Sequence, residues 1–385
     1  MKGQIRRILV ATGVDALGTG CYLAVAPLYL MKVTGLSPSA AGLTFSAAAV
    51  VGMLGSIFVG RLSEWSRIGN LLPCLYAVQG VCFLCFPLMS SAATALAVMG
   101  VAAAAERATS PIRAALISEI SGADRYLFIA RMRTVQNVSF SVAGLLVIPV
   151  LLDDGRSSYT AVALINTGSF LIAAIFMTGL RLPEKTHTAD QDTEKRLWTA
   201  MRNRRVFISM TVDAMVYLYA SLYLYLLPVW IATETKLPKV TISVIFVTNA
   251  VAVGLFQTRV SKGLDSISRG KRAMIAAASL LVCSCLFLIP VPHLSMAPGI
   301  AFLAVAMALL TAAEMLHSGG RWAISLELAP PARRASFLAT FNMGLNVQTI
   351  VGPMLLTVLI LGNQAAGWLS LGGIFLLAGL TAFAI

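Results

Sequence analysis

AERATSPIR, residues 105–113, places Glu106, Arg107 and Arg113 inside an apolar segment long enough to cross a lipid bilayer. Charged side chains at such a depth are costly unless they are paired or face water, so they are rare and commonly functional. Because Glu106, Ser110 and Arg113 follow one another at helical spacing, we expect them on one face of a helix. The stretch therefore indicates a membrane-spanning helix with a polar face.

A second segment repeats this spacing 208 residues later. The matched pairs are Glu106 and Glu314, Arg113 and Arg321, and Glu119 and Glu327. Three earlier motifs also recur, with an offset of 198 residues. They are Arg6-Arg7 with Arg204-Arg205, Val14-Asp15-Ala16 with Val212-Asp213-Ala214, and Arg61-Leu62-Ser63 with Arg259-Val260-Ser261. Matches in the same order at a nearly constant offset indicate a duplicated unit.

The composition places the chain in a bilayer. Of its 385 residues, 58% are hydrophobic and 12% are charged, whereas a soluble domain has about 25% charged residues. On a soluble protein, the net charge of +13 would suggest nucleic acid as a partner. Here the basic residues lie in short loops between apolar runs, so we interpret them as signals of membrane topology and expect no nucleic-acid partner.

Twelve apolar segments are long enough to span a membrane, since a spanning helix needs roughly 20 residues. They cover residues 8–31, 39–61, 71–90, 94–120, 128–152 and 158–180 in the first half, and 206–232, 239–262, 272–292, 297–325, 336–361 and 366–385 in the second. The segment between these halves is polar and charged. We therefore expect an N-terminal six-helix bundle, 1–180, a cytoplasmic linker, 181–205, and a C-terminal six-helix bundle, 206–385.

The Lys and Arg residues predict the orientation of the chain. Most of them lie in loops on the side of the membrane that holds the N-terminus and the linker. The opposite side has only Lys32, Arg156, Lys236 and Lys239. Because basic residues concentrate in cytoplasmic loops, we expect a multi-pass protein of the cell inner (plasma) membrane with both termini cytoplasmic.

The two six-helix halves and the loop after the second span resemble the major facilitator superfamily. The family pattern in this loop is roughly G-x-L-x-D-R-x-G-R. The chain has Gly60, Leu62 and Glu64 at matching positions, with Arg67-Ile68-Gly69 displaced by one residue. The resemblance covers the whole chain and extends to the drug/metabolite:proton antiporter group with degenerate motifs, since Arg107 lacks the Gln-Gly that follows the helix 4 arginine there. It implies an all-α membrane protein with twelve transmembrane helices in two six-helix repeats.

In the family, the loop after helix 2 latches the cytoplasmic ends of helices during alternating access. The resemblance implies such a role for Gly60, Arg61, Glu64, Arg67, Glu119, Arg125 and Arg131. An acid near a helix end could pair with arginines of a neighbouring helix in one state and release them in the other. The alternative is that Arg61 and Arg67 only fix the topology.

The resemblance also implies that helices 1, 4, 7 and 10 line a central cavity. The candidates for contact with substrate are Arg107, Ser110, Arg113, Tyr217, His317 and Arg321. The alternative is that Glu106 with Arg113, and Glu314 with Arg321, form internal pairs that neutralise one another and hold helices together. Two copies at mid-span favour a function, because isolated charges in lipid are costly.

Four carboxylates are candidates for proton coupling: Glu106, Glu314, Asp15 and Asp213. A carboxylate in a cavity of low dielectric constant can exchange a proton near neutral pH. Glu106 and Glu314 lie deeper and are the better candidates. The aspartates could instead be solvated near the cytoplasmic ends of helices 1 and 7, or pair with a nearby arginine such as Arg7. His317 could join a relay with Glu314 or simply be packed.

These features predict a proton-coupled secondary transporter that exports small organic or amphipathic compounds by alternating access. One alternative is a proton symporter or facilitator that imports a small metabolite, which could be anionic. Another, of a different class, is a non-transporting membrane receptor or scaffold. No catalytic cluster, phosphate-binding glycine loop or metal-ligand spacing occurs, so we expect neither enzymatic activity nor a cofactor or metal. We expect a monomer whose partners are a small-molecule substrate, protons and the lipid bilayer.

Overall fold

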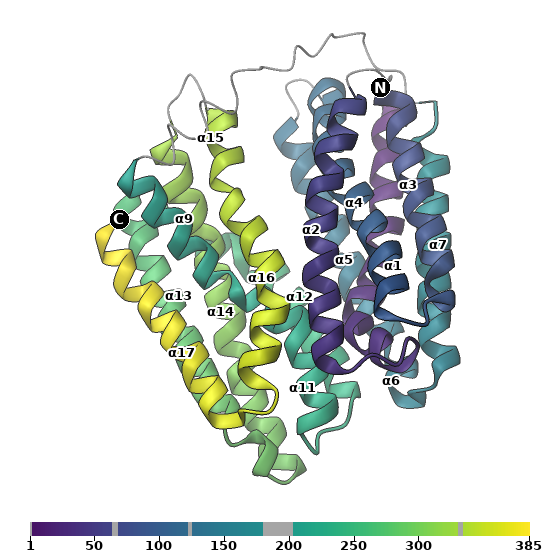
Figure 1. The fold of residues 1–385 in the computed structure, drawn as a ribbon. Helices are drawn as coiled ribbons and strands as arrows, with labels where there is room; N and C mark the ends of the chain where they lie inside the picture. Colours follow the sequence, from purple (N-terminus) through teal and green to yellow (C-terminus); the bar gives the residue numbers. More distant parts are fainter. Residues whose placement is uncertain (1, 64–67, 122–124, 180–202, 330–333) are drawn as a thin grey trace. The chain divides into compact units, whose positions relative to one another are not determined.

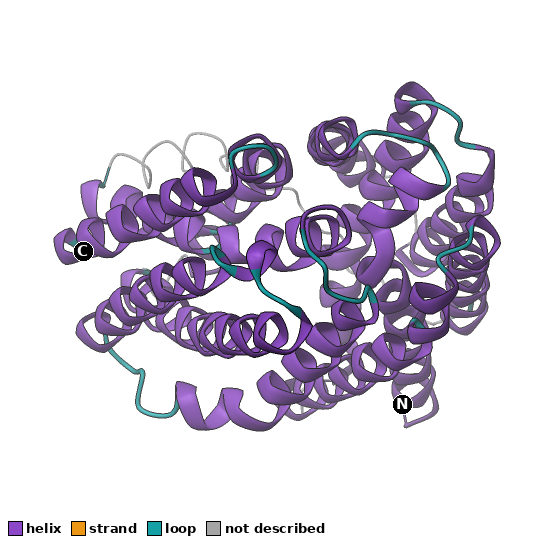
Figure 2. Ribbon diagram, turned by 90° about the horizontal axis from the view of Figure 1, so that it is seen from below, coloured by secondary structure: helices purple, strands orange, loops and turns teal. Residues whose placement is uncertain are grey.

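A computed structural model describes the chain at residues 2–63, 68–121, 125–179, 203–329 and 334–385. All regular structure in these residues is helical (Figures 1 and 2). The prediction of an all-α membrane protein is therefore confirmed.

The helices keep the labels of Figure 1. In the first half they are α1 (Lys2–Lys32), α2 (Pro38–Ser63), α3 (Ile68–Cys85), the 3-10 turn η1 (Phe86–Leu88), α4 (Ala92–Ser121), α5 (Arg125–Leu146), α6 (Ile148–Asp153) and α7 (Arg156–Met177). In the second half they are α9 (Arg204–Val216), α10 (Leu218–Ser221), the π-helical turn η3 (Leu222–Leu226), α11 (Leu227–Glu234), α12 (Val240–Ser261), α13 (Ile267–Leu288), the 3-10 turn η4 (Val291–His293), α14 (Met296–Leu328), α15 (Arg334–Phe341), α16 (Met343–Ile360), α17 (Gln364–Thr381) and the 3-10 turn η6 (Ala382–Ala384).

Eleven stretches of the described residues are long and apolar enough to cross a membrane, and each corresponds to one of the twelve predicted spans. The remaining predicted span, 94–120, corresponds to α4. Its 30 residues extend about 45 Å at a rise of about 1.5 Å per residue, which exceeds the hydrocarbon core of a bilayer. The twelve predicted spans are thus all helical in the part of the chain that the structure describes.

The chain divides into two compact units. The first unit comprises Met1–Ala189 and Lys239–Val251, and the second comprises Asp190–Pro238 and Ala252–Ile385. The first part of α12 thus groups with the first unit. Most of the predicted linker, 181–205, lies outside the described residues.

In the first unit, α1 packs against α5 and α7, α2 packs against α4, and α3 packs against α4 and α7. The approach of α1 to α7 requires Gly18, because a Cβ atom there would lie 2.0 Å from Oγ of Ser169. Rings of α1 and α3 fill the adjacent space, with Tyr22 edge-on to Phe83 at a centroid distance of 4.8 Å.

In the second unit, α13 packs against α14 and α17, and α9 packs against α14, α16 and α17. A Cβ atom on Gly270 of α13 would lie 2.8 Å from the carbonyl oxygen of Gly320 on α14, and the reverse distance is the same. Helix α11 begins one residue before Pro228, and the π-helical turn η3 precedes it. Proline explains this turn, since its ring clashes with the carbonyl four residues earlier and it has no N–H to donate.

Two lysines bind Asp154, which follows α6 in the first unit. Nζ of Lys32, at the end of α1, lies 2.6 Å from Oδ2 of Asp154, and Lys239 contacts the same oxygen. Tyr159 on α7 donates to Oδ1 at 2.9 Å. Burial by itself raises the pKa of Asp154, but hydrogen bonds from Lys239, Lys32 and Tyr159 outweigh it and hold the pKa below its ordinary value. The cluster joins the ends of several helices through one carboxylate.

We expect Gly270→Ala to destabilise the chain, because the new Cβ atom would meet the backbone carbonyl of Gly320. The free energy of unfolding in detergent should fall by about 1–3 kcal/mol. Gly254→Ala in α12 is the matched control, since nothing lies within 4 Å of its Cβ position. Alanine in that helix interior should stabilise by about 0.5–1 kcal/mol. Equal effects of the two substitutions would contradict the close approach.

Asp154→Asn should lower the stability of the chain at neutral pH, by about 1 kcal/mol or less because the lysines are partly exposed. A folded-state pKa below the ordinary value of 3.8 means that the stabilisation is present above that value and lost as the pH falls through the folded-state pKa. The difference in Tm between the chain and the variant should therefore be constant near neutral pH and shrink below pH 3.8. A difference that grows on acidification would show that the lysines do not stabilise the ionised carboxylate.

Candidate functional site

Each unit contains one polar cluster in which an aspartate of its first helix meets an arginine of a long central helix. The α1–α4 cluster consists of Asp15, Tyr76 and Arg113. The α9–α14 cluster consists of Asp213, Tyr219, His317, Arg321 and Asn342.

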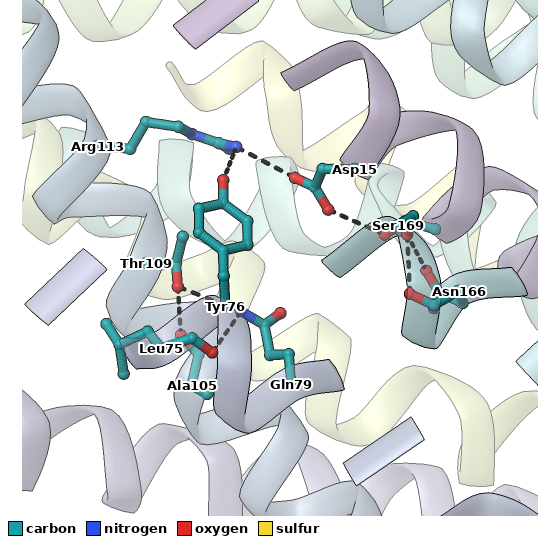
Figure 3. Close-up of polar contacts among 10 residues, drawn as sticks. Asp15, Leu75, Tyr76, Gln79, Ala105, Thr109, Arg113, Asn166 and Ser169 are labelled. Atoms are coloured by element: carbon teal, nitrogen blue, oxygen red, sulfur yellow. Dashed lines mark hydrogen bonds and ion pairs between the residues drawn. The ribbon is translucent and has the colours of Figure 1, made fainter. Parts of the chain in front are cut away.

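In the α1–α4 cluster, Arg113 on α4 points toward Tyr76 on α3 and Asp15 on α1 (Figure 3). Its Nη1 donates to Oη of Tyr76 at 3.1 Å and lies 3.4 Å from Oδ2 of Asp15. Thr19, one turn along α1, donates to Oδ1 of Asp15 at 3.3 Å. Tyr76 is fully buried, but the side chains of Asp15 and Arg113 are 17% and 19% exposed. The charge pair is therefore accessible from one side.

The adjacent part of α3 is fixed against α4 by a second polar contact (Figure 3). Nε2 of Gln79 donates to Oγ1 of Thr109 at 3.3 Å and to the carbonyl oxygen of Leu75 at 3.2 Å. Gln79 and Thr109 are both buried. Because a broken hydrogen bond between buried groups is costly, this contact keeps Tyr76 in register with Arg113.

In the α9–α14 cluster, Asp213 on α9 is completely buried and has two partners on α14. Nε of Arg321 lies 3.0 Å from Oδ2 of Asp213, and Nε2 of His317 lies 2.9 Å from Oδ1. The side chain of His317 is 1% exposed. A buried carboxylate is tolerated here because both of its oxygens are bonded to groups that carry or can accept positive charge.

The other ring nitrogen of His317 faces a tyrosine. Nδ1 lies 3.5 Å from Oη of Tyr219. The rings of Tyr217 and Tyr219 pack around the imidazole, with centroid distances of 5.7 and 5.5 Å. The imidazole thus connects a carboxylate to a phenol through its two nitrogens, which fixes its orientation.

Arg321 is held on several sides. Besides Asp213, it donates from Nη2 to the side-chain oxygen of Asn342, which lies at the break between α15 and α16. Its guanidinium also lies over the rings of Phe341 and Trp322, at 5.7 and 6.0 Å from their centroids. Nε and Nη2 of Arg321 therefore each donate a hydrogen bond to another side chain.

The two clusters occupy corresponding places in the duplicated unit. Asp15 and Asp213 are 198 residues apart, and Arg113 and Arg321 are 208 residues apart. The third partner differs between the units, because a tyrosine of α3 fills this place in the first and a histidine of α14 fills it in the second. Only histidine among ordinary side chains changes charge near neutral pH without a large perturbation, so the α9–α14 cluster has the group suited to proton exchange.

The mid-span glutamates lie beside these clusters. Glu106 is exposed on α4 and within electrostatic range of Asp15, Arg107 and Arg113. Arg107 is half-buried on the same helix. Glu314 is half-buried on α14 and within range of the nearby tyrosines. The structure thus brings the predicted carboxylates and arginines of each unit into one neighbourhood.

The ion pairs that the structure shows for the two arginines do not run to the glutamates of their own helices, and the alternative of internal Glu–Arg pairs stays a prediction. Arg113 and Arg321 pair instead with the aspartates of α1 and α9. Arg7, the other arginine considered for the aspartate of α1, donates to the carbonyl oxygens of Phe176 and Thr178 at 3.1 and 2.5 Å. Pairing between helices leaves the exposed side of Arg113 available, whereas a pair within α4 would have filled it.

Most of the predicted latch lies outside the described part of the chain. Glu64 and Arg67 fall in the segment 64–67, which the structure does not describe. The residues placed on helices without described side chains are Gly60 and Arg61 on α2, Glu119 on α4 and Arg125 on α5; the cavity candidate Ser110 on α4 is another. Arg131 is exposed on α5. The latch stays a prediction.

Sequence reasoning did not assign Thr19 or Tyr76 to a site. Tyr76 had a usable signal, because it is the sole tyrosine of the predicted span 71–90. A polar tip in such a span needs a partner. Nothing in the sequence says which neighbouring helix supplies that partner.

The described side chains contain no group of three or more His, Cys, Asp or Glu residues that could hold a metal ion. The clusters instead combine carboxylates, guanidinium groups, phenols and one imidazole. Such groups can bind ions and exchange protons without covalent chemistry.

Residues 8–314 match the family model described as Major Facilitator Superfamily. No curated protein matches the chain in sequence. Among solved structures, a peptide transporter POT in complex with sulfate is 12% identical, with a TM-score of 0.78 over 99% of this chain and 94% of that chain. The nucleoside transporter NupG is 14% identical, with a TM-score of 0.75 over 99% of this chain and 98% of that chain.

A POT family transporter in complex with a thioalcohol-conjugated peptide is also similar, with 12% identity and a TM-score of 0.77 over 99% of this chain and 95% of that chain. Identities this low show a shared fold and nothing finer. The family model and these similar structures confirm the predicted fold of two six-helix repeats.

We expect Asp213→Asn to reduce the free energy of unfolding in detergent by about 3–5 kcal/mol, because it leaves Arg321 as a buried charge without its carboxylate. Arg321→Gln should be similarly costly for the opposite reason. The double variant should be less destabilised than the two single effects combined, by at least about 1 kcal/mol. Additive effects would show that Asp213 and Arg321 do not stabilise one another.

Proposed function

Since this chain belongs to the major facilitator superfamily and is therefore a membrane transporter and not an enzyme, we propose that it couples the transport of a small organic compound to the movement of protons. The coupling operates by alternating access, with the site open to one side of the membrane at a time. The predicted halves, 1–180 and 206–385, are the two bundles of this cycle.

The observation that carries this proposal is the buried bridge of His317 between Asp213 and Tyr219. When His317 is neutral, Arg321 balances the charge of Asp213. When His317 is protonated, the same carboxylate must stabilise two cations. Any movement of Arg321 away from Asp213 therefore changes the free energy of protonating His317, and this links a conformational change to a proton.

The other predicted proton carriers support the same reading. Glu106 is exposed and lies beside Asp15, and Glu314 lies on the helix that carries His317. These carboxylates could deliver protons to, or remove them from, the two clusters. We place the principal proton site at Asp213 and His317, because there the titratable group has a bonded partner on each side.

Two directions of transport are compatible with this site. Export of an organic or amphipathic compound in exchange for protons is the direction that the sequence predicts. Import of an anionic compound together with protons is the second candidate, and the incompletely bonded guanidinium of Arg113 favours it. The pH gradient that drives accumulation distinguishes these two directions.

The test uses proteoliposomes with an imposed pH gradient and four labelled probes: a dipeptide, a nucleoside, tetraphenylphosphonium and benzoate. The first two represent the compounds named for the similar structures. We expect at least one probe to accumulate only under a gradient, and we expect His317→Gln to abolish this accumulation. Exchange of the same probe without a gradient should continue, because the variant changes proton binding and not the fold.

His293→Gln is the matched control, since His293 is exposed at the end of η4 and should not affect coupling. Glu106→Gln and Glu314→Gln test the other carriers in the same assay. If gradient-driven transport continues in His317→Gln but is lost in a glutamate variant, the proton site is at that glutamate and not at His317. If the imposed pH gradient changes the transport of none of the four probes, proton coupling is refuted.

A further inference from the structure

We propose that Arg113 binds a carboxylate of the transported compound, on the edge of its guanidinium formed by Nε and Nη2. The inference rests on the proposed function only in calling this compound the substrate. Binding of a carboxylate at Arg113 does not itself require proton coupling.

Arg113 has hydrogen-bond donors that its described partners do not use. A guanidinium has five N–H donors, and within the described residues only Nη1 of Arg113 has partners, Tyr76 and Asp15. The contact with Asp15 is long, at 3.4 Å. Nε and Nη2 make no hydrogen bond with the side chains that the structure describes, yet they are not among the fully buried polar atoms that lack a partner. Because the side chain of Arg113 is 19% exposed, these donors are accessible.

The second argument is the geometry of the free donors. Nε–H and the neighbouring Nη2–H point the same way along one edge of the planar group, and this edge matches the two oxygens of a carboxylate. In the second unit the same edge of Arg321 is occupied, by Asp213 at Nε and Asn342 at Nη2. The duplicated unit thus has one edge filled by the protein and one left open.

The third argument is the balance of charge around Arg113. Asp15 of α1, Tyr76 of α3 and Glu106 of α4 lie within electrostatic range of Arg113, and Arg107 lies within range of Glu106. With both carboxylates ionised and both arginines charged, the formal sum is zero. A bound carboxylate adds one negative charge, which is costly inside a bilayer unless a proton enters with it. Asp15 is the nearest site for that proton, since it is already bonded to Arg113.

If Arg113 binds the anion, the Asp15 and Arg113 variants should change anion binding in opposite directions, which an ion pair with only a structural role would not do. Asp15 competes with an incoming anion for the guanidinium, so removing the charge of Asp15 should strengthen anion binding. Removing the charge of Arg113 should abolish it. A proton on Asp15 would have the effect of the first change, so anion and proton would bind together, as in co-transport.

The experiment measures binding of benzoate to the purified full chain in detergent, from the increase in Tm with concentration, and uses benzamide as the uncharged control. We expect millimolar binding of benzoate and none of benzamide, since one bidentate pair carries the affinity. Arg113→Gln should abolish the benzoate effect, and Arg113→Lys should weaken it about tenfold, because lysine cannot present a planar fork. Asp15→Asn should strengthen it about tenfold.

Arg156→Gln is the matched control, because Arg156 is an exposed arginine of the same unit at the start of α7 and should leave benzoate binding unchanged. If Asp15→Asn weakens benzoate binding, or if benzoate raises Tm no more than benzamide does, the inference fails. Should Arg113 variants keep benzoate binding while His317→Gln abolishes coupling, the inference fails and the proposed function stands. If the Arg113 variants lose benzoate binding while His317→Gln keeps coupling, the inference stands and the proposed proton site is refuted.

Discussion

The cost of charge in a bilayer is the constraint on which the polar interior of this protein depends. Two ion pairs, Asp15 with Arg113 and Asp213 with Arg321, each join the first helix of a unit to a long helix that begins about ninety residues after it. Neither partner could stay ionised alone at that depth without a large penalty. Each pair therefore links two helices that pack mainly against other helices of the unit.

Duplication explains why the fold could be predicted and why the site could be predicted only in part. Apolar runs of sufficient length identify spans without knowledge of their neighbours, and the repeated Glu106–Arg113 spacing identified a polar face on one helix. Periodicity says which side of a helix is polar, but not which helix that side meets. The sequence thus offered Glu106 of the same helix as an alternative partner of Arg113, and in the structure Asp15 of α1 pairs with it. Tyr76 was missed for the same reason, since its role depends on contact with α4.

The two units also show how one ancestral arrangement supports different chemistry. Their aspartates and arginines correspond, but the surroundings do not. Arg321 has a filled edge and two aromatic neighbours, and its carboxylate partner also bonds to an imidazole. Arg113 has a phenol, a long contact to a carboxylate and free donors. A symmetric sequence repeat has thus produced one cluster that is internally satisfied and one that is not.

The π-helical turn Leu222–Leu226 affects how the spanning segment around it meets the neighbouring helices. An additional residue in one turn rotates the side chains after it relative to those before it. Before the turn, Asp213 and Tyr219 face α14. Helix α9 also packs against α16 and α17, and these contacts continue beyond it, where Gln348 donates to Ser221 at 2.8 Å and Trp230 meets Trp368. The segment therefore contacts α16 and α17 on both sides of the turn, while Asp213 and Tyr219 before it are directed at α14.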